Sequence, residues 1–224
     1  LETMSKREKL PIFYFDKFGN PTKKPDVKKP TPAGVTAQTV LNDYIKAIGG
    51  EKAVKNVKTL SVISSGTVQG MALELNMKNA PKKLAVEMKA NGMSMMKQIV
   101  QQGKRKDFAG EELLDMQAEA NTFKELALLT DKEITVTGIE YVNGTEAYAL
   151  KNGKSTLYYD VKTGLKIAES KEVEQRGQKM EQTTYYQDYK DVKGLKFPHK
   201  IVMKVGIEIE FTTSEVKINE GVTE

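Results

Sequence analysis

The sequence lacks cysteine altogether and has a single histidine, His199, among its 224 residues. Without cysteine the fold uses no disulfide, and thiolate metal sites and thiol nucleophiles are excluded. A catalytic zinc site keeps three protein ligands, drawn mainly from Cys and His, so one histidine is a poor basis for it. We therefore expect no metal, no cofactor and no catalytic residue in this segment.

Long apolar runs are also missing, because none approaches the roughly 20 residues of a membrane-spanning helix. The charges balance closely, with 35 basic and 30 acidic residues, and their signs are interspersed in stretches such as KEVEQRGQKMEQ. That pattern indicates a solvated surface and argues against nucleic-acid binding. The run Lys104-Arg105-Lys106 is an exception, either a solvated turn or a contact for anionic headgroups.

Proline is concentrated near the start of the chain, with four of its seven residues in 19–34. Proline lacks the N–H donor and disfavours helix at the preceding residue, so this segment is expected to be an extended linker. The stretch LPIFYFDKF, residues 10–18, is typical of a strand. We divide the chain into an N-terminal piece at 1–18, a linker at 19–34 and a β-rich domain at 35–224.

Apolar periodicity describes the domain further. A helix is expected over 36–48, with Thr36 as N-cap and Gly49-Gly50 as its end, and a further turn over 51–57. A second helix is expected over 110–129. Most of the remainder alternates between apolar and polar residues, with a bulge expected at Met95-Met96 and turn signals at Asn143-Gly144 and Lys193-Gly194.

The expected fold class is α+β and mainly antiparallel β. About ten strands joined by short turns make a meander, and a sheet of that size curls. We expect one large curled sheet, a half-barrel, with the two helices covering its concave face.

Several stretches resemble a known family: TVLNDYIKAIGGEKAVKNVKTL (39–60), FAGEELLDM (108–116), VNGTEAYAL (142–150), YYDVKTGLKI (158–167) and YQDYKDVKGLKFPHKI (186–201). Residues 35–219 are similar to the LolA/LolB-like, lipoprotein-carrier-like domain of Bacteroidetes-type envelope proteins. In that setting the domain resembles the C-terminal appendix of pitrilysin/insulinase-like zinc peptidases.

The resemblance implies a periplasmic or envelope location and gives residues 1–18 a meaning, as the end of a preceding peptidase-like domain. The alternative is an edge strand of the main sheet. On the first interpretation residues 1–34 are dispensable for folding. The H-x-x-E-H zinc helix of those peptidases is absent, so no catalytic residue is carried over to this segment.

A ligand cavity is the main site expected from the residues themselves. Methionine adapts to irregular apolar shapes and is frequent on promiscuous binding surfaces, although ordinary core is the more usual explanation of the same residues. The candidate lining residues are five methionines on alternating strands and one residue of a tyrosine cluster. They are Met71, Met77, Met88, Met93, Met95 and Tyr186.

Two further features have a structural and a functional interpretation. Tyr185, Tyr186 and Tyr189, with Tyr158 and Tyr159, either line a pocket or are ordinary cross-strand residues. His199 is either an acid/base or ligand group, or a packed side chain with one hydrogen bond.

These observations leave two main functions open. The first is a non-catalytic accessory domain of an envelope zinc peptidase, packing on the peptidase domain or binding an apolar ligand. The alternative is an independent periplasmic carrier or sensor of lipids or lipoproteins, with at most peripheral membrane contact. An enzyme in its own right is a third possibility that the shortage of His and Cys disfavours.

Overall fold

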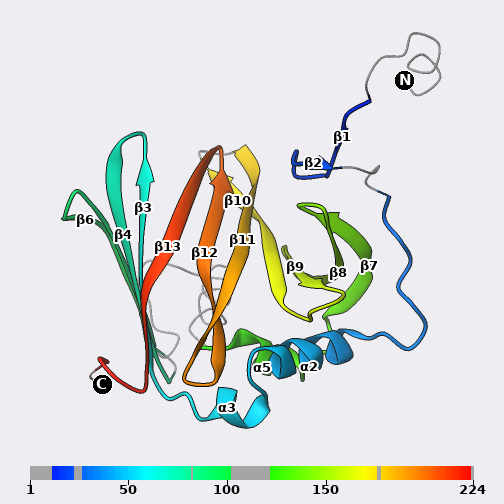
Figure 1. The fold of residues 1–224 in the computed structure, drawn as a ribbon, viewed down its shortest axis with the longest axis horizontal. Helices are drawn as coiled ribbons and strands as arrows, with labels where there is room; N and C mark the ends of the chain where they lie inside the picture. Colours follow the sequence, from blue (N-terminus) through cyan, green and yellow to red (C-terminus); the bar gives the residue numbers. More distant parts are fainter. Residues whose placement is uncertain (1–11, 23–26, 82, 102–121, 176–177, 223–224) are drawn as a thin grey trace.

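A computed structural model of the chain describes residues 12–22, 27–81, 83–101, 122–175 and 178–222 (Figure 1). Within these ranges the chain is mostly β-structure, with three short helices at one end of a large sheet. The helices are α2 (Ala37–Ala47), α3 (Glu51–Lys55) and α5 (Lys124–Leu128). The strands are β1 (Tyr14–Phe15), β2 (Pro21–Thr22), β3 (Leu60–Val68), β4 (Met71–Ala80), β5 (Lys83–Ala90), β6 (Met93–Gln101), β7 (Thr135–Val142), β8 (Thr145–Asn152), β9 (Ser155–Asp160), β10 (Lys166–Gln175), β11 (Gln178–Val192), β12 (Leu195–Val205) and β13 (Ile207–Ile218).

Eleven of these strands form one antiparallel sheet in the order β6-β5-β4-β3-β13-β12-β11-β10-β9-β8-β7. The order differs from the single meander expected, because two meanders, β3–β6 and β7–β13, are joined where β13 pairs with β3. The two ends of the order, β6 and β7, do not pair with each other, so the sheet is open. The expectation of one large, mainly antiparallel sheet is confirmed.

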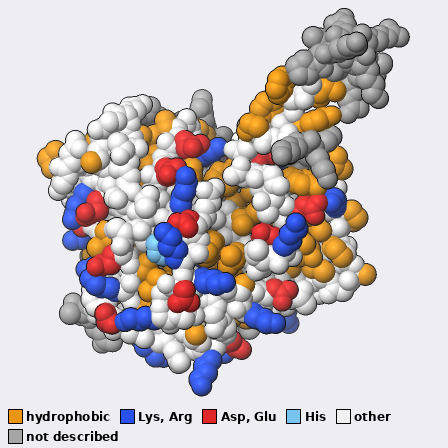
Figure 2. Space-filling model, in the orientation of Figure 1, with side chains coloured by type: hydrophobic (Ala, Val, Ile, Leu, Met, Phe, Trp, Pro, Cys, Tyr) orange, Lys and Arg blue, Asp and Glu red, His pale blue; other side chains and the backbone are white. Residues whose placement is uncertain are grey.

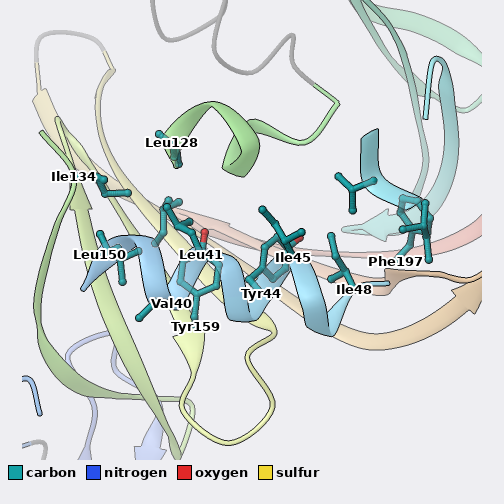
Figure 3. Close-up of a cluster of buried hydrophobic side chains, with 14 of the residues drawn as sticks. Val40, Leu41, Tyr44, Ile45, Ile48, Leu128, Ile134, Leu150, Tyr159 and Phe197 are labelled. Carbon is teal, nitrogen blue, oxygen red and sulfur yellow. The ribbon is translucent and has the colours of Figure 1, made fainter. Parts of the chain in front are cut away.

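The helix expected at 36–48 forms as α2, and Thr36 is its N-cap. The Thr36 and Thr39 side chains each accept a hydrogen bond from the other's backbone N–H, which satisfies two donors that the first turn leaves unpaired. The apolar stripe of the helix packs on side chains from the sheet and α5 (Figure 3). This buried core includes Val40, Leu41, Tyr44, Ile45, Ile48, Leu128, Leu150, Leu157, Tyr159, Leu195 and Phe197.

In four of the two-residue hairpins that connect neighbouring strands, both central residues have positive φ. The expected turns Asn143-Gly144 and Lys193-Gly194 are confirmed, and Asn91-Gly92 and Gln69-Gly70 are built alike. Such turns match the right-handed twist of the strands that they join. They also fix the register, so each strand's apolar face is set by its neighbouring turn.

The bulge expected at Met95-Met96 is present in β6. Met96 pairs with Met88 and Ser94 pairs with Lys89, which leaves Met95 as the extra residue of β6. A bulge of this kind bends the strand and strengthens its twist.

The N-terminal residues pack on the face of the sheet opposite to α2. Phe18 meets Tyr158 and Tyr185 edge-on, with ring centroids 5.6 and 6.0 Å apart. The buried carboxylate of Asp16 accepts hydrogen bonds from the backbone N–H of Phe18 and of Asn143. Residues 12–22 are therefore anchored to the domain, although their strand β1 pairs with β2 and not with the main sheet.

One residue of the expected linker, Lys29, pairs with the sheet. Its N–H and C=O exchange hydrogen bonds of 2.8 and 2.9 Å with Ile139 at the edge strand β7. Lys29 precedes Pro30, and a residue before proline favours an extended conformation while keeping its own N–H donor. The proline spacing therefore favours this bridge. The division of the chain into three segments stays a prediction.

The surface has the mixed charge that the sequence indicates, since Figure 2 shows basic and acidic side chains interspersed on the visible face. The helices lie together at one end of the sheet (Figure 1). Of the expected helix at 110–129, only 122–129 is described, and α5 lies there. That the helices cover the concave face stays a prediction. The run Lys104-Arg105-Lys106 lies outside the described residues.

Candidate functional site: a cavity inside the curled sheet

A cavity of about 510 Å³ lies on the inner side of the curled sheet, next to α5. Side chains of β3, β4 and β5 line one wall, and side chains of β10, β11 and β12 line the other. The outermost of these strands, β5 and β10, are not neighbours in the sheet order, and they border one space because the sheet curls. Tyr44 of α2 and Phe123, Lys124 and Glu125 complete the lining at the helical end.

The first wall is apolar, and strand register explains its composition. Residues directly opposite in an antiparallel pair point to the same face. Val62 is opposite Met77, and Met77 is opposite Val86, so the three form one row across β3, β4 and β5. Leu60 and Leu84 flank Asn79 in the next row. Alternation along each strand repeats the pattern, which gives a continuous hydrocarbon surface broken only by Asn79.

The second wall is polar at its centre. Glu169 is opposite Thr184, and Lys171 is opposite Gln182, in neighbouring rows of β10 and β11. All four side chains line the cavity, as does Tyr186 two residues further along β11. The cavity is therefore amphipathic, with hydrocarbon on one side and charged and hydrogen-bonding groups on the other.

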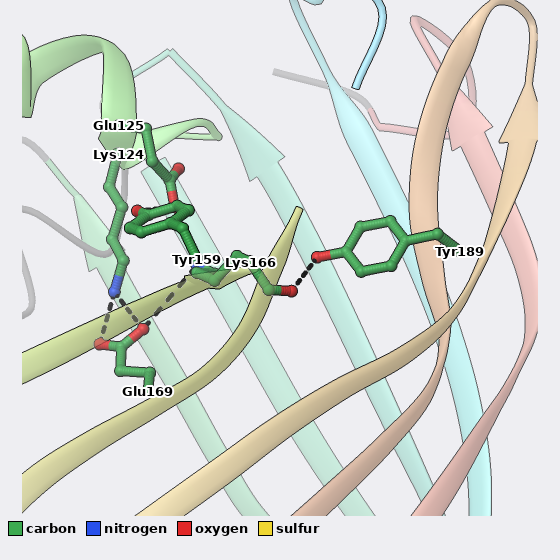
Figure 4. A network of polar contacts seen from close by, with 6 residues as sticks. All are labelled: Lys124, Glu125, Tyr159, Lys166, Glu169 and Tyr189. Carbon is green, nitrogen blue, oxygen red and sulfur yellow. Dashed lines mark hydrogen bonds and ion pairs between the residues drawn. The ribbon is translucent and has the colours of Figure 1, made fainter. Parts of the chain in front are cut away.

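An ion-pair network lines the helical end of the cavity, and Figure 4 shows its members. Lys124 Nζ lies 2.6 and 2.7 Å from the two carboxylate oxygens of Glu169. Lys166 Nζ lies 2.9 Å from Glu125 Oε1 and 3.8 Å from Glu169 Oε2. Two lysines from β10 and α5 thus face two glutamates from the same two elements, so the network is neutral as a whole.

Glu125 and Lys166 favour each other's charged form. Burial opposes the charged form of Glu125, but the ammonium groups of Lys166 and Lys124 outweigh it and lower the pKa of this carboxyl group. Burial likewise opposes the charged form of Lys166, yet the carboxylate of Glu125 leads the effects that raise its pKa well above the usual value. Glu125 and Lys166 are therefore both ionised near neutral pH.

Buried tyrosines surround the network and stay protonated. Burial, reinforced by the negative charge of Glu125, raises the pKa of both Tyr44 and Tyr159 well above the usual value. Burial also raises that of Tyr189, whose hydroxyl donates to the backbone oxygen of Lys166 over 2.8 Å. The ring of Tyr186 lies beneath Lys166, with Nζ 4.7 Å from its centroid. These contacts fix Lys166 at the edge of the cavity.

The structure brings together only two of the six expected lining residues, Met77 and Tyr186. Met88 packs in a separate core cluster with Leu73 and Phe211. Met93 and Met95 are each 68% exposed, and Met71 is 38% exposed, near the tips of hairpins. Whether these four contribute to ligand binding stays a prediction, but none lines this cavity.

The tyrosine cluster divides between the two faces of the sheet. Tyr159 and Tyr186 face the core and the cavity, whereas their neighbours Tyr158 and Tyr185 lie under Phe18 on the opposite face. His199, the pale blue side chain in Figure 2, is half-buried, and its Nδ1 lies 3.0 Å from the backbone oxygen of Phe197. It does not line the cavity.

The polar wall was missed by sequence reasoning. The stretch KIAESKEVEQ places Glu169 and Lys171 on one face of a strand, which looks like a solvated surface until the sheet curls over it. In the described residues, no group of three His, Cys, Asp or Glu side chains is arranged to hold a metal ion. The helices of the same part of the chain include none long and apolar enough to cross a membrane.

Comparison with known proteins gives matches at the level of structure alone. No protein-family model and no curated protein sequence matches the chain. A LolA superfamily protein from Nitrosomonas europaea matches with 11% identity and a TM-score of 0.47, covering 84% of this chain and 96% of its own. A DUF1329 family protein from Desulfovibrio piger matches with 9% identity and a TM-score of 0.47, covering 84% of this chain and 95% of its own.

Proposed function

We propose that this domain binds an apolar or amphipathic ligand, such as a lipid acyl chain, and serves as a carrier or sensor for it. The observation that carries the proposal is the amphipathic cavity of about 510 Å³ with its apolar rows of Val62, Met77 and Val86. Ligand sites in proteins range from about 300 to 1,000 Å³ and are predominantly apolar with a few placed polar groups. An apolar cavity of that kind accepts a hydrophobic guest.

A titration with a fluorescent fatty acid tests this function. We expect saturable binding at micromolar levels by the unmodified protein, and a loss of at least about tenfold in affinity for Met77→Lys, since a buried ammonium next to hydrocarbon is costly. Ile99→Lys is the control, because it places the same ammonium group on an exposed residue of the same sheet. It should bind as the unmodified protein does.

Thermal melts of both variants accompany the titration, so that a folding defect is not mistaken for lost binding. The absence of saturable binding by the unmodified protein contradicts the proposal, and so does an equal loss of affinity in Met77→Lys and Ile99→Lys. A native mass spectrum of freshly purified protein is an independent check, because a tightly held lipid adds a defined mass to the chain.

The remaining expectations belong to this proposal as well. We also propose, as the sequence leads us to expect, a non-catalytic role in the periplasm or cell envelope. Neither of the two structures named above is described as a peptidase, and the role as a peptidase appendix stays a prediction. A zinc-peptidase helix encoded upstream in the same reading frame would favour it.

A further inference from the structure

Asn79 is the polar residue of the apolar cavity wall, and what it implies about the ligand rests on the proposed function. Residues directly opposite in neighbouring strands point to the same face of a sheet. Register therefore places five side chains in one row, from β13 through β3, β4 and β5 to β6: Ile218, Leu60, Asn79, Leu84 and Val100. All five are buried, and Asn79 is only 4% exposed. An amide thus lies in the middle of a buried apolar row.

The side-chain amide of Asn79 lines the cavity, and no other residue in the described ranges makes a hydrogen bond with it. Other buried polar groups are satisfied by the protein, such as the hydroxyls of Ser64 and Thr213, which lie 3.0 Å apart. A buried polar group without a partner costs stability, whereas an apolar side chain would complete the row. The amide therefore points to a partner that enters the cavity, either a ligand or water.

The chemistry of the amide narrows the polar group that a ligand would offer. An Asn side chain carries a carbonyl acceptor and two N–H donors, so a group that both donates and accepts satisfies it best. Leu60 and Leu84 lie on either side of it. Next to buried apolar side chains a charged group loses far more hydration free energy than a neutral one. The fitting group is therefore uncharged, such as an amide or a hydroxyl.

We propose that Asn79 binds the uncharged amide or hydroxyl head group of a single-chain lipid, whose alkyl chain lies along Val62, Met77 and Val86. These three residues form the neighbouring row of the same wall, two positions away from Leu60, Asn79 and Leu84 on their strands. The amide of Asn79 donates one hydrogen bond to the head group and accepts another from it. The hydrocarbon of the next row then covers the chain.

Competition against the fluorescent fatty acid with three ten-carbon compounds tests this inference. Decanamide has an uncharged head that donates and accepts, decane has no head group, and decanoate is charged. Asn79→Leu should weaken decanamide at least about tenfold and leave decane unchanged, because only decanamide loses hydrogen bonds. Decanoate should bind the unmodified protein about tenfold more weakly than decanamide.

Stability separates a ligand contact from a structural one. In ligand-free protein Asn79→Leu should leave the thermal midpoint unchanged or raise it, because leucine completes the row without an unpaired amide. Asn79→Ala removes the amide without adding bulk, and it should weaken decanamide relative to decane as well. Asn76→Leu is the matched control, since Asn76 lies on the other face of β4 and donates to Glu74. It should change none of the affinities.

Three outcomes have different meanings. Equal effects of the Asn79 variants on decanamide and decane overturn the inference, because water then satisfies the amide, and they leave the proposed function intact. Tighter binding of decanoate than of decanamide also overturns it, since the head group would then be charged. Failure of every compound to bind, the fluorescent fatty acid included, contradicts the proposed function itself.

Discussion

Lys166 and Glu125 form a buried ion pair that joins β10 to α5, with Nζ 2.9 Å from Oε1. The two residues are 41 positions apart in sequence. A buried ion pair adds little net stability compared with well-packed apolar residues, but the loss of one partner leaves a buried charge uncompensated. The pair therefore fixes where α5 sits at the end of the cavity more than it stabilises the fold.

Removing one partner of this pair should be costly. Glu125→Gln leaves the Lys166 ammonium buried with Glu169, at 3.8 Å, as the remaining carboxylate partner among the described residues, so we expect the free energy of unfolding to fall by about 3 kcal/mol. Urea denaturation measures it. Glu51→Gln, which breaks the exposed pair between Glu51 and Lys55, should change stability by less than about 0.5 kcal/mol. Similar effects for the two variants would show that Glu125 is solvated.

The same pair predicts a pH dependence with a definite sign. The pKa of Glu125 is lowered in the folded protein from its usual 4.5, so the unfolded chain binds a proton first as the pH falls. Its contribution to stability is complete above about pH 5 and is lost as the pH falls through the folded-state pKa. Lys166 has a raised pKa, so its contribution is complete below 10.5 and is unchanged in this range.

A double variant isolates that contribution from other carboxylates such as Glu140, whose pKa is lowered as well, by Lys17 and Lys28 against the effect of burial. Glu125→Leu with Lys166→Met replaces the pair by apolar side chains. Its unfolding free energy should fall less steeply than that of the unmodified protein between pH 6 and pH 3, followed by urea midpoints. Parallel profiles for the two proteins would contradict the assignment.

The cavity residues were only partly predictable from the sequence, and Met71, Met77 and Met88 show why. Alternation places all three on one face of the sheet, and register confirms that. Alternation does not say how far along the strand a residue lies from the helical end, and only Met77 lies in the row that borders the cavity. Local periodicity determines which face of the sheet a side chain lies on. Whether that side chain borders the cavity depends on the curl of the whole sheet.

The pairing of β3 with β13 shows the same limit at the scale of the fold. Turn residues such as Asn143-Gly144 predict hairpins because the signal lies within the hairpin itself. Val62 and Val216 are opposite each other in the sheet although more than 150 residues separate them, and no local pattern marks that contact. The charged cavity wall depends on this long-range closure, so Glu169 and Lys171 resemble surface residues in the sequence.

The N-terminal segment should contribute to stability, contrary to its expected dispensability. Phe18→Ala removes the edge-on contacts with Tyr158 and Tyr185, and we expect a loss of about 1–3 kcal/mol. Phe13→Ala changes a side chain that is 75% exposed and should be neutral. Deletion of residues 1–34 should lower the thermal midpoint by more than about 5 °C. An unchanged midpoint would restore the interpretation of this segment as a detached piece.

If the cavity is empty without its ligand, a larger side chain in its wall should fill part of it. Val86 is half-buried in the apolar wall, and the larger side chain of Val86→Phe extends into the empty volume. In ligand-free protein we expect a gain of about 0.5–2 kcal/mol, because new apolar contacts form without displacing neighbours. The same change should weaken binding of the fluorescent fatty acid at least about tenfold, since it occupies the space of the alkyl chain.

Ile99→Phe is the control for that experiment, because Ile99 is exposed on β6 and an added ring there fills no cavity. It should alter neither the thermal midpoint nor the affinity. If Val86→Phe instead loses 1–3 kcal/mol, the value typical of overpacking, then the space beside Val86 is already filled in the folded protein. If the cavity is a ligand site, Val86→Phe should increase stability and decrease ligand affinity at the same time.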